Sequence, residues 1–374
     1  MIPVLIILTI FYLSVLYFLH TGVNRLRDGR NATEYSASVI IAARNEAAGI
    51  KACLDALLNQ KYPSDRYEII VVDDRSTDNT AAIVSQVATT NMQVRLIQIT
   101  ELSILMAPKK HALTTGIEAS SGEIILITDA DTIPSPGWIR GMIKQFEQEV
   151  GLVAGFAPLD RSKKQNLFFK LIRLDSLALA AVAAGSIGRG FPLTCTARSL
   201  GYRREVFNLV DGFHRIAKFI SGDDDLFMHL VRDHTDWQIR YAIDPDATVS
   251  SAAVSDIHQF VNQRIRHASK GLAYSFLSKL MLSAIYLFNL MVMVMLIAGI
   301  WRQSFLITGA VVFFVKAVAE YLLLSQFSSR MKVQHYLRYF PAAMFLHIPY
   351  VVIFGLMGQL GSFHWKGKRF STKL

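Results

Sequence analysis

Long apolar runs at the two ends of the chain limit its fold more than any other feature of the sequence. Four such runs are present: Met1–Leu19, Leu280–Ile300, Ser304–Ser325 and Tyr339–Phe363. The first two contain no charged residue, and a helix of about 20 apolar residues can cross a bilayer. We therefore predict an N-terminal transmembrane anchor over residues 1–22 and a C-terminal transmembrane region of about three helices over residues 271–365. A basic tail, 366–374, follows.

Basic residues beside the first run predict its orientation. Arg25, Arg27 and Arg30 follow it directly, and positively charged loops stay on the cytoplasmic side of a membrane. The region after Arg25 is therefore expected in the cytoplasm. A cleaved signal peptide is the alternative interpretation, but the basic start and the small-residue cleavage site that it requires are missing.

The last apolar stretch leaves the orientation of the C-terminus open. Three C-terminal spans, which we prefer, place the basic tail outside, against the same rule. The alternative is a re-entrant hairpin bent at Pro349. In the stretch before it, Lys316 and Glu320 are four residues apart, so they share one helix face and are expected to satisfy each other within the membrane.

The composition narrows the classes of function. The 374 residues include 39 Lys and Arg against 29 Asp and Glu, a net charge of +10, with 52% hydrophobic and 18% charged residues. This balance excludes a disordered chain and suits an anionic lipid surface or a phosphate-bearing ligand. Nucleic acid is not expected as a partner, because the sequence has no basic arm or recognition motif. Cys53 and Cys195 are too few for a disulfide framework.

Short β-branched runs alternate with helical patterns between the apolar ends. Strands are predicted at Ser38–Ala42, Glu68–Val72, Val94–Ile99 and Ile124–Thr128, and helices at Glu46–Asn59, Thr77–Thr89 and Lys110–Ala119. Continuous apolar strands that recur about every 25–30 residues are typical of a doubly wound parallel sheet in an α/β domain. Such sheets bind ligands beyond the carboxyl ends of their strands, so the residues there are the first candidates for a site.

Acidic residues follow two of these strands. Asp73 and Asp74 end the second strand, and Asp129 and Asp131 follow the fourth. The simplest alternative is that Asp74 or Ser76 caps the next helix, which explains one acid but not two adjacent ones. Two carboxylates separated by one residue, beside a diphosphate, suit a hard divalent cation, which neutralises charge on a departing diphosphate.

Together, these segments resemble the family 2 glycosyltransferases of the GT-A fold. The matching segments are Ser38–Glu46 (the first strand and nucleotide loop), Val71–Asp78 (VDDxSxD), Lys109–Gly116 (KxxALNxG, with Thr114 in place of Asn) and Thr128–Asp131 (the metal-binding DxD). The resemblance covers roughly residues 36–270. It implies an α/β, Rossmann-like nucleotide-diphospho-sugar transferase domain, cytosolic over residues 23–270. The implied reaction is inverting transfer from a nucleotide sugar, in the first place a UDP-sugar, with Mg²⁺ or Mn²⁺.

The resemblance also implies roles for individual residues. The acid that contacts the nucleoside corresponds to Asp74, and the metal ligands correspond to Asp129 and Asp131. The predicted nucleotide-sugar site as a whole is Ala43, Arg44, Glu46, Asp73, Asp74, Lys109, Asp129, Gln263 and Arg266.

A basic segment late in the mixed region resembles the QxxRW signature of that family. Gln263 and Arg266 match, with His267 in place of Trp, and the Arg266 guanidinium suits bidentate contact with the diphosphate. Histidine offers a smaller and more polar ring than tryptophan, which weakens the case for a growing polysaccharide as acceptor. The alternative interpretation of residues 263–270 is a basic juxtamembrane helix that binds lipid headgroups.

The catalytic base is expected in the acidic run Asp223, Asp224 and Asp225. A general base must be ionised near the acceptor hydroxyl, and the resemblance to an ED segment of the family assigns this role to Asp224. Asp225 is a close rival, because three adjacent acids leave the register open. A solvated turn that caps a helix over Leu226–Arg232 is the alternative to a catalytic role. Repulsion between neighbouring carboxylates is expected to raise the pKa of one of them.

The acceptor is predicted from the remaining apolar segment, residues 166–187. Its charges lie only in its first half, which favours an interfacial helix over a further deep span. This helix and the basic juxtamembrane residues favour a lipid-borne acceptor, such as a glycolipid. The alternatives are a processive polysaccharide synthase and, less favoured, a non-catalytic membrane scaffold. We expect an integral membrane protein with a cytoplasmic catalytic domain, at the inner membrane of a bacterium.

Overall fold

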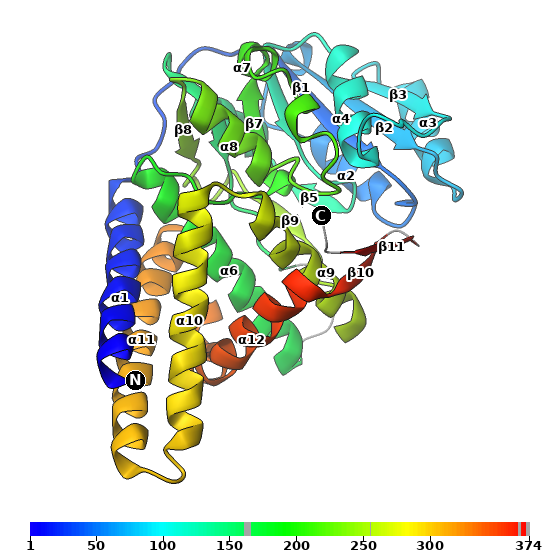
Figure 1. The fold of residues 1–374 in the computed structure, drawn as a ribbon. Helices are drawn as coiled ribbons and strands as arrows, with labels where there is room; N and C mark the ends of the chain where they lie inside the picture. The colour runs from blue at the N-terminus through cyan, green and yellow to red at the C-terminus, as the bar shows by residue number, and fades with distance from the viewer. Residues whose placement is uncertain (161–165, 255, 366–367, 372–374) are drawn as a thin grey trace.

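The computed structural model describes residues 1–160, 166–254, 256–365 and 368–371. An α/β domain lies at one end of a group of long helices (Figure 1). A seven-stranded sheet with the order β3-β2-β1-β4-β7-β6-β8 forms the centre of this domain. Its strands are β1 (Ala37–Ala43), β2 (Tyr67–Asp74), β3 (Val94–Ile99), β4 (Ile124–Ile127), β6 (Val150–Ala154), β7 (Leu200–Arg203) and β8 (Gln238–Tyr241).

The four predicted strands are all present. β1, β2, β3 and β4 run parallel, and β1, β2 and β4 are almost wholly buried, as their continuous apolar runs predict. The sheet also contains β7, a strand that the sequence pattern did not predict and that is antiparallel to β4 and β6. The chain leaves β6 at Ala154 and re-enters the sheet at Leu200, which pairs with Ala154. β7 therefore runs back along β6 in the opposite direction.

Short helices and a second, two-stranded sheet complete the α/β domain. They are α2 (Ile50–Leu58), α3 (Thr80–Thr90), α4 (Pro108–Glu118), α5 (Trp138–Ile143), α7 (Arg204–Leu209), α8 (Asp225–His234), α9 (Ile257–Ser269) and the pair β5 (Thr132–Pro134) and β9 (Val249–Ser251). Two helices begin later than predicted, at Ile50 rather than Glu46 and at Thr80 rather than Thr77. Residues before them bond across the two loops, as when Ala47 N–H donates to Asp78 (3.1 Å).

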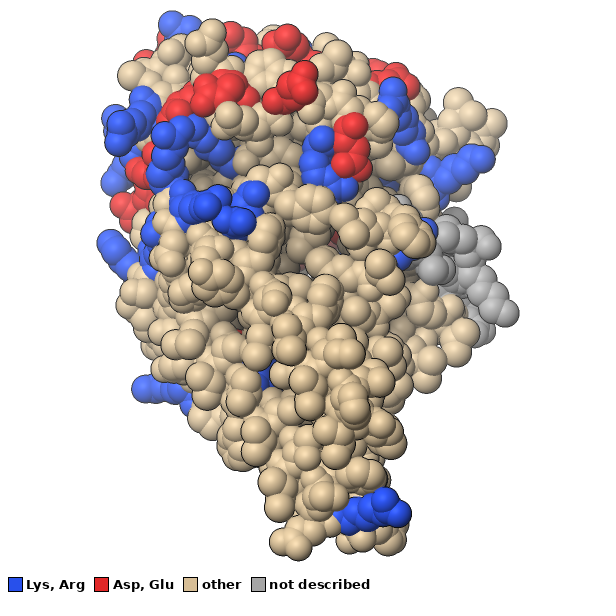
Figure 2. All heavy atoms as spheres, turned by 60° about the vertical axis from the view of Figure 1, so that its left-hand side comes forward, with Lys and Arg blue, Asp and Glu red and all other residues tan. Residues whose placement is uncertain are grey.

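Within the described residues, four helices are long and apolar enough to cross a membrane, one near the N-terminus and three in the C-terminal part, as predicted. They are α1 (Ile2–Arg25), α10 (Phe276–Ala298), α11 (Gln303–Arg330) and the stretch Gln334–Leu360, which contains α12 (Phe340–Leu360). In Figure 2 the charged side chains gather on the α/β domain, above a broad, mostly uncharged surface of the long helices. The distribution of charge therefore agrees with a protein whose helical part lies in lipid.

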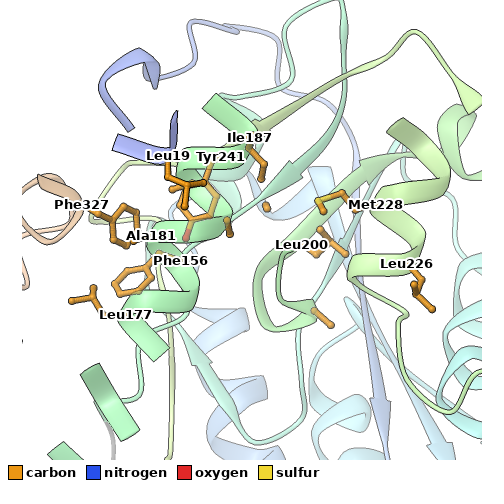
Figure 3. Packing of buried hydrophobic residues seen from close by; sticks show 14 of the residues in the cluster. Leu19, Phe156, Leu177, Ala181, Ile187, Leu200, Leu226, Met228, Tyr241 and Phe327 are labelled. Atoms are coloured by element: carbon orange, nitrogen blue, oxygen red, sulfur yellow. The ribbon is translucent and has the colours of Figure 1, made fainter. Parts of the chain in front are cut away.

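A fifth long helix, α6 (Leu167–Gly188), crosses α1 at very short distance. A Cβ atom added to Gly22 would lie 1.8 Å from the carbonyl oxygen of Gly185, so only glycine permits this approach. One buried apolar cluster then continues from the sheet through α6 to α1 and α11. Figure 3 shows Leu19, Ala181 and Phe327 together with Tyr241 of β8 in this cluster. The α/β domain and the long helices therefore share one core.

The end of α12 lies against the α/β domain. Gln359 donates a hydrogen bond to the Ala268 carbonyl of α9 (3.3 Å), and the hairpin of β10 (Ser362–Trp365) and β11 (Lys368–Ser371) lies beside α9 (Figure 1). The alternative hairpin bent at Pro349 is not seen, because Pro349 lies inside one continuous helix. Three C-terminal spans stay a prediction, with the stretch that contains α12 as the third candidate. The basic tail lies largely outside the described residues.

The predicted pair within α11 is confirmed. Lys316 Nζ lies 2.8 Å from Glu320 Oε1, and the same carboxylate accepts from Tyr12 of α1 at 2.5 Å. His347 of α12 lies 2.9 Å from the Lys316 ammonium. Polar groups in lipid are costly unless they satisfy one another, so this cluster joins the three helices.

Candidate functional site

A cavity of about 970 Å³ lies at the carboxyl ends of β1, β2 and β4. Its other walls come from α4, α6, α8 and α9. The residues predicted from the sequence that line it are Ala43, Arg44, Glu46, Asp74, Lys109, Asp129, Asp131, Asp223, Asp224, Asp225, Gln263 and Arg266. Asp73 is not part of the lining; its carboxylate accepts from the Ser76 N–H at 3.4 Å and shapes the loop after β2. The structure thus brings both predicted halves of the site to one cavity.

The loops after β1 and β2 are bonded to each other. Asn45 N–H donates to the Ser76 hydroxyl (2.9 Å), and Glu46 N–H donates to the Thr80 hydroxyl (2.9 Å). Neither Asp74 nor Ser76 caps α3, whose N-cap is Asn79, so helix capping does not account for Asp74.

Asp74 is held at the cavity wall by two arginines. Its carboxylate lies 2.7 Å from the Arg75 guanidinium and 3.7 Å from that of Arg44. Its side chain is only 7% exposed. This pairing fixes the direction of a carboxylate at the edge of the sheet where a nucleoside is predicted to lie.

Lys109 joins the two groups of acids. Its ammonium lies 2.9 Å from Asp129 Oδ1 and 3.0 Å from Asp223 Oδ2. Burial works against the charged form of Asp129, but Lys109 lowers the pKa of Asp129 below its ordinary value. The acid that follows the fourth strand and the acid before α8 therefore share one cation.

Asp131, the second acid of the DxD pair, differs from Asp129 in its pKa. Burial, together with the charges of Asp129 and Glu46, raises the pKa of Asp131 to about 6. The protein therefore disfavours the ionised form of Asp131, and a divalent cation between Asp129 and Asp131 would relieve this repulsion. Among the described residues no three His, Cys, Asp or Glu side chains form a metal site by themselves. Mg²⁺ at phosphate sites takes one or two carboxylates plus phosphate oxygens, so the pair fits such an ion.

Lys110, next to Lys109, points to a different element. It is fully buried and donates to the carbonyl oxygens of Phe219 (2.5 Å) and Ser221 (3.0 Å). Burial lowers the pKa of Lys110 to about 8. These carbonyls precede the acidic run, so α4 also fixes the turn that carries the candidate base.

The acidic run differs residue by residue. Asp223 turns toward Lys109, while Asp224 is the N-cap of α8 and accepts from the Asp225 N–H at 2.8 Å. Asp225 is buried, and its carboxylate accepts from the Tyr274 hydroxyl at 2.8 Å. Burial, and then the charge of Asp224, raises the pKa of Asp225 to about 6, while Lys270 opposes the shift.

Asp224 is the better placed of the two rivals for the base. Burial opposes its charge, but Lys270 and the Asp225 N–H hold the pKa of Asp224 well below its ordinary value. Its side chain is 18% exposed, against 5% for Asp225. Asp224 is therefore ionised and more open to the cavity. The alternative of a solvated capping turn holds only in part: Asp224 is the N-cap of α8, but Asp223 and Asp225 are buried.

The basic segment on α9 faces the same cavity. Gln263, Arg266 and His267 all line it. Burial lowers the pKa of Arg266 and lowers the pKa of His267 well below its ordinary value, so His267 is a neutral ring. Arg264 turns to α6 and pairs with Asp175 (2.6 Å). The segment therefore lines the cavity from α9, and headgroup binding by its other face stays a prediction.

Sequence reasoning missed three cavity residues that act on the acids. Lys270 and Tyr274 contact the run before α8. Arg198 lies in the short 3₁₀ helix Ala197–Ser199 before β7, and its charge lowers the pKa of Asp129. None of them belongs to a recognisable motif. The basic character of residues 263–270 was the one sequence signal that pointed to Lys270.

Comparisons with known proteins agree with this arrangement. The family described as "Glycosyl transferase family 2" matches residues 38–208, and that described as "Glycosyl transferase family group 2" matches residues 124–357. A solved mannosyltransferase from Pyrobaculum calidifontis, in complex with GDP-Man and Mn²⁺, shares the fold. It is 21% identical, with a TM-score of 0.54, and the match covers 92% of this chain and 99% of that one.

Curated relatives are similar over part of their length. The probable glycosyltransferase YdaM of Bacillus subtilis is 29% identical over 193 residues, 50% of this chain and 45% of that protein. The glycosyltransferase AglE of Haloferax volcanii is 39% identical over 119 residues, 32% and 38% of the two chains. Hyaluronan synthase of Streptococcus pyogenes is 32% identical over 181 residues, 47% and 42%. The matches thus span less than half of the length of each relative.

Proposed function

Because the chain belongs to the family 2 glycosyltransferases, we propose that it is a membrane-bound inverting glycosyltransferase of the GT-A fold that moves a sugar from a nucleotide sugar to a hydroxyl of a lipid-borne acceptor. The observation that carries this proposal is the single cavity in which Lys109 joins Asp129 to Asp223. Donor-side and acceptor-side acids stand close enough for direct transfer between two bound substrates.

The donor side binds the nucleotide diphosphate in this proposal. Asp74, fixed by Arg44 and Arg75, contacts the nucleoside, and Arg266 contacts the diphosphate from α9. Asp129 and Asp131 would hold Mg²⁺ or Mn²⁺, which when bound neutralises charge on the departing diphosphate. The relatives do not fix the base of the nucleotide, and a UDP-sugar is our first choice of donor.

The acceptor side removes a proton. Asp224 takes the proton of the acceptor hydroxyl, whose oxygen forms a bond to the anomeric carbon while the bond from that carbon to the diphosphate breaks. Attack from the side opposite the leaving group inverts the sugar. Asp225 is held away by Tyr274, which supports Asp224 rather than its neighbour as the base.

The wall formed by α6 supports a lipid-borne acceptor. Leu179, Ala180 and Ala183 of α6 line the cavity, and the same helix packs against α1. A hydroxyl carried at the membrane surface can therefore approach the base along an apolar wall. We propose residues 1–22 as the anchor, 23–270 as the cytoplasmic catalytic domain and 271–365 as the C-terminal membrane region.

A processive polysaccharide synthase is the second candidate. The similarity to hyaluronan synthase over 181 residues favours it, whereas the smaller, neutral ring of His267 in place of tryptophan favours a single transfer. Product length separates the two, because a single transfer adds one sugar and a synthase makes a polymer.

The test uses purified, detergent-solubilised protein with Mn²⁺ or Mg²⁺ and a panel of UDP-, GDP- and other nucleotide sugars. Nucleotide diphosphate release is followed with and without a total lipid extract of the source cells, beside Asp131→Ala and Asp224→Asn. We expect release with one donor, dependent on lipid and lost in both variants. Release that needs only a soluble oligosaccharide would contradict the lipid acceptor. A protein that neither binds nor turns over any donor would instead be a scaffold.

A further inference from the structure

Two residues between α9 and α10 hold the acidic run before α8. Lys270 Nζ lies 3.2 Å from Asp224 Oδ1 and 3.2 Å from both carboxylate oxygens of Asp225. The Tyr274 hydroxyl donates to Asp225 Oδ2 at 2.8 Å. The two neighbouring carboxylates therefore share a cation, and the second also accepts from a hydroxyl.

These contacts are shielded from water. The Lys270 side chain is 12% exposed, and those of Asp224 and Asp225 are 18% and 5% exposed. Charge pairs in such surroundings are screened much less than pairs on the surface. Removing one partner of a buried pair leaves an uncompensated charge. The positions of both carboxylates therefore depend on the position of the Lys270 ammonium.

We propose that Lys270 and Tyr274 are positioning residues that hold Asp225 aside and Asp224 toward the acceptor hydroxyl, so that the segment entering the membrane sets the place of the base. This inference rests on the proposed role of Asp224. Neither residue needs to touch a substrate, because each acts through a carboxylate.

Lys270 and Tyr274 lie in the segment that connects α9 of the α/β domain to α10, a candidate membrane helix. Lys270 begins the short 3₁₀ helix Lys270–Ala273 directly after α9, and α10 begins at Phe276. The Tyr274 ring also packs edge-on against His229 of α8, with the ring centres 5.2 Å apart. A shift of α10 relative to the α/β domain therefore moves the partners of Asp224 and Asp225.

The experiment compares four variants in the donor and acceptor assay described above. Lys270→Met removes the cation, Lys270→Arg retains it, and Tyr274→Phe removes one hydroxyl. Lys279→Met is the matched control, because it removes an exposed cation on α10 that lies outside the cavity. Donor binding is measured separately by titration calorimetry, and thermal unfolding checks that each variant is folded.

We expect Lys270→Met to lower kcat about 10- to 100-fold, less than the 10²–10⁴-fold contribution of a positioned base itself, with donor affinity changed less than about twofold. The acid limb of the kcat profile moves to higher pH, by about one unit or more, because an adjacent cation lowers the pKa of a carboxylate by about 1–3 units. Lys270→Arg restores part of kcat, Tyr274→Phe gives a smaller loss, and Lys279→Met has no effect.

Other charged groups also act on Asp224, and none of them is changed in these variants. They are its sequence neighbours Asp223 and Asp225, Asp129 after β4, Lys109 and Lys110 of α4, Arg198 before β7, and Arg266 and His267 of α9. An unchanged kcat in folded Lys270→Met would overturn the inference. So would a loss of kcat with an unmoved acid limb and no rescue by arginine. If wild-type protein releases no nucleotide from any donor, the proposed function itself fails, and the positioning role fails with it.

Discussion

The two walls of the cavity are built in different ways. The donor wall consists of consecutive strand ends, in which the backbone of β1 pairs with β2 up to Asp73 and that of β2 pairs with β3 up to Asp74. The acceptor wall comes from helices α6, α8 and α9 and the segment before α10. Its functional side chains are held by side chains, as Lys270 holds Asp224. A sheet fixes its edge through many backbone hydrogen bonds, whereas one substitution can release the acceptor wall.

Substitution of one functional acid in each wall should give the largest effects and should distinguish the functions of the two walls. We expect Asp131→Ala to lose both transfer and metal-dependent donor binding, because the donor wall holds the diphosphate. Asp224→Asn loses about 10²–10⁴-fold in kcat while donor binding stays near that of wild type. Calorimetry measures donor binding and nucleotide release measures kcat, both on the same preparations. Equal loss of donor binding in both variants would mean that the walls do not work separately.

The crossing of α1 and α6 tests how far the acceptor wall depends on the membrane anchor. Gly22→Ala places a Cβ against backbone atoms of Gly185, and overpacking of this kind costs about 1–3 kcal/mol, or more where backbone must move. We expect a lower unfolding temperature in detergent and reduced transfer. Gly271→Ala is the matched control, since its nearest neighbour would be a side-chain atom of Gln359 at 3.9 Å. Equal stability of the two variants would contradict the close approach.

Lys110 connects the two walls, and its titration gives a test by pH. Lys110→Met leaves the Phe219 and Ser221 carbonyls without their donor, which costs about 1–3 kcal/mol. The pKa of Lys110 is lowered to about 8 in the folded protein, against about 10.4 when unfolded. Between these values the unfolded chain binds more protons, so this group makes wild-type stability rise with pH across that window.

Thermal unfolding of wild type and Lys110→Met at several pH values between about 7 and 10 measures this slope. We expect the difference in unfolding temperature to grow as the pH rises through the window, because only wild type gains. A difference that shrinks with rising pH would show that Lys110 is not held in a site that disfavours its charge.

The same contrast explains what the sequence predicted. Strand positions and the acids after β2 and β4 follow from contiguous segments, because a buried parallel strand and the loop after it are adjacent in the chain. The reversal of β7 was not predictable, since it depends on where α6 returns the chain. Lys270 and Tyr274 were missed for a similar reason: their partners lie more than 40 residues away in sequence, and no local pattern marks a side chain that bonds at such a distance.

A surface pair on the donor side should have the smallest effect. Lys51 and Asp55 of α2 form an i,i+4 ion pair at 2.9 Å, with side chains 66% and 52% exposed. Water and salt screen such a pair, and pairs of this kind contribute about 0.3–0.5 kcal/mol. We therefore expect Lys51→Met, Asp55→Asn and the double variant to unfold within about one degree of wild type, with unchanged nucleotide release. A coupling energy above about 1 kcal/mol in this cycle would mean that even exposed side-chain pairs stabilise the donor side, and the difference between the two walls would then be one of degree.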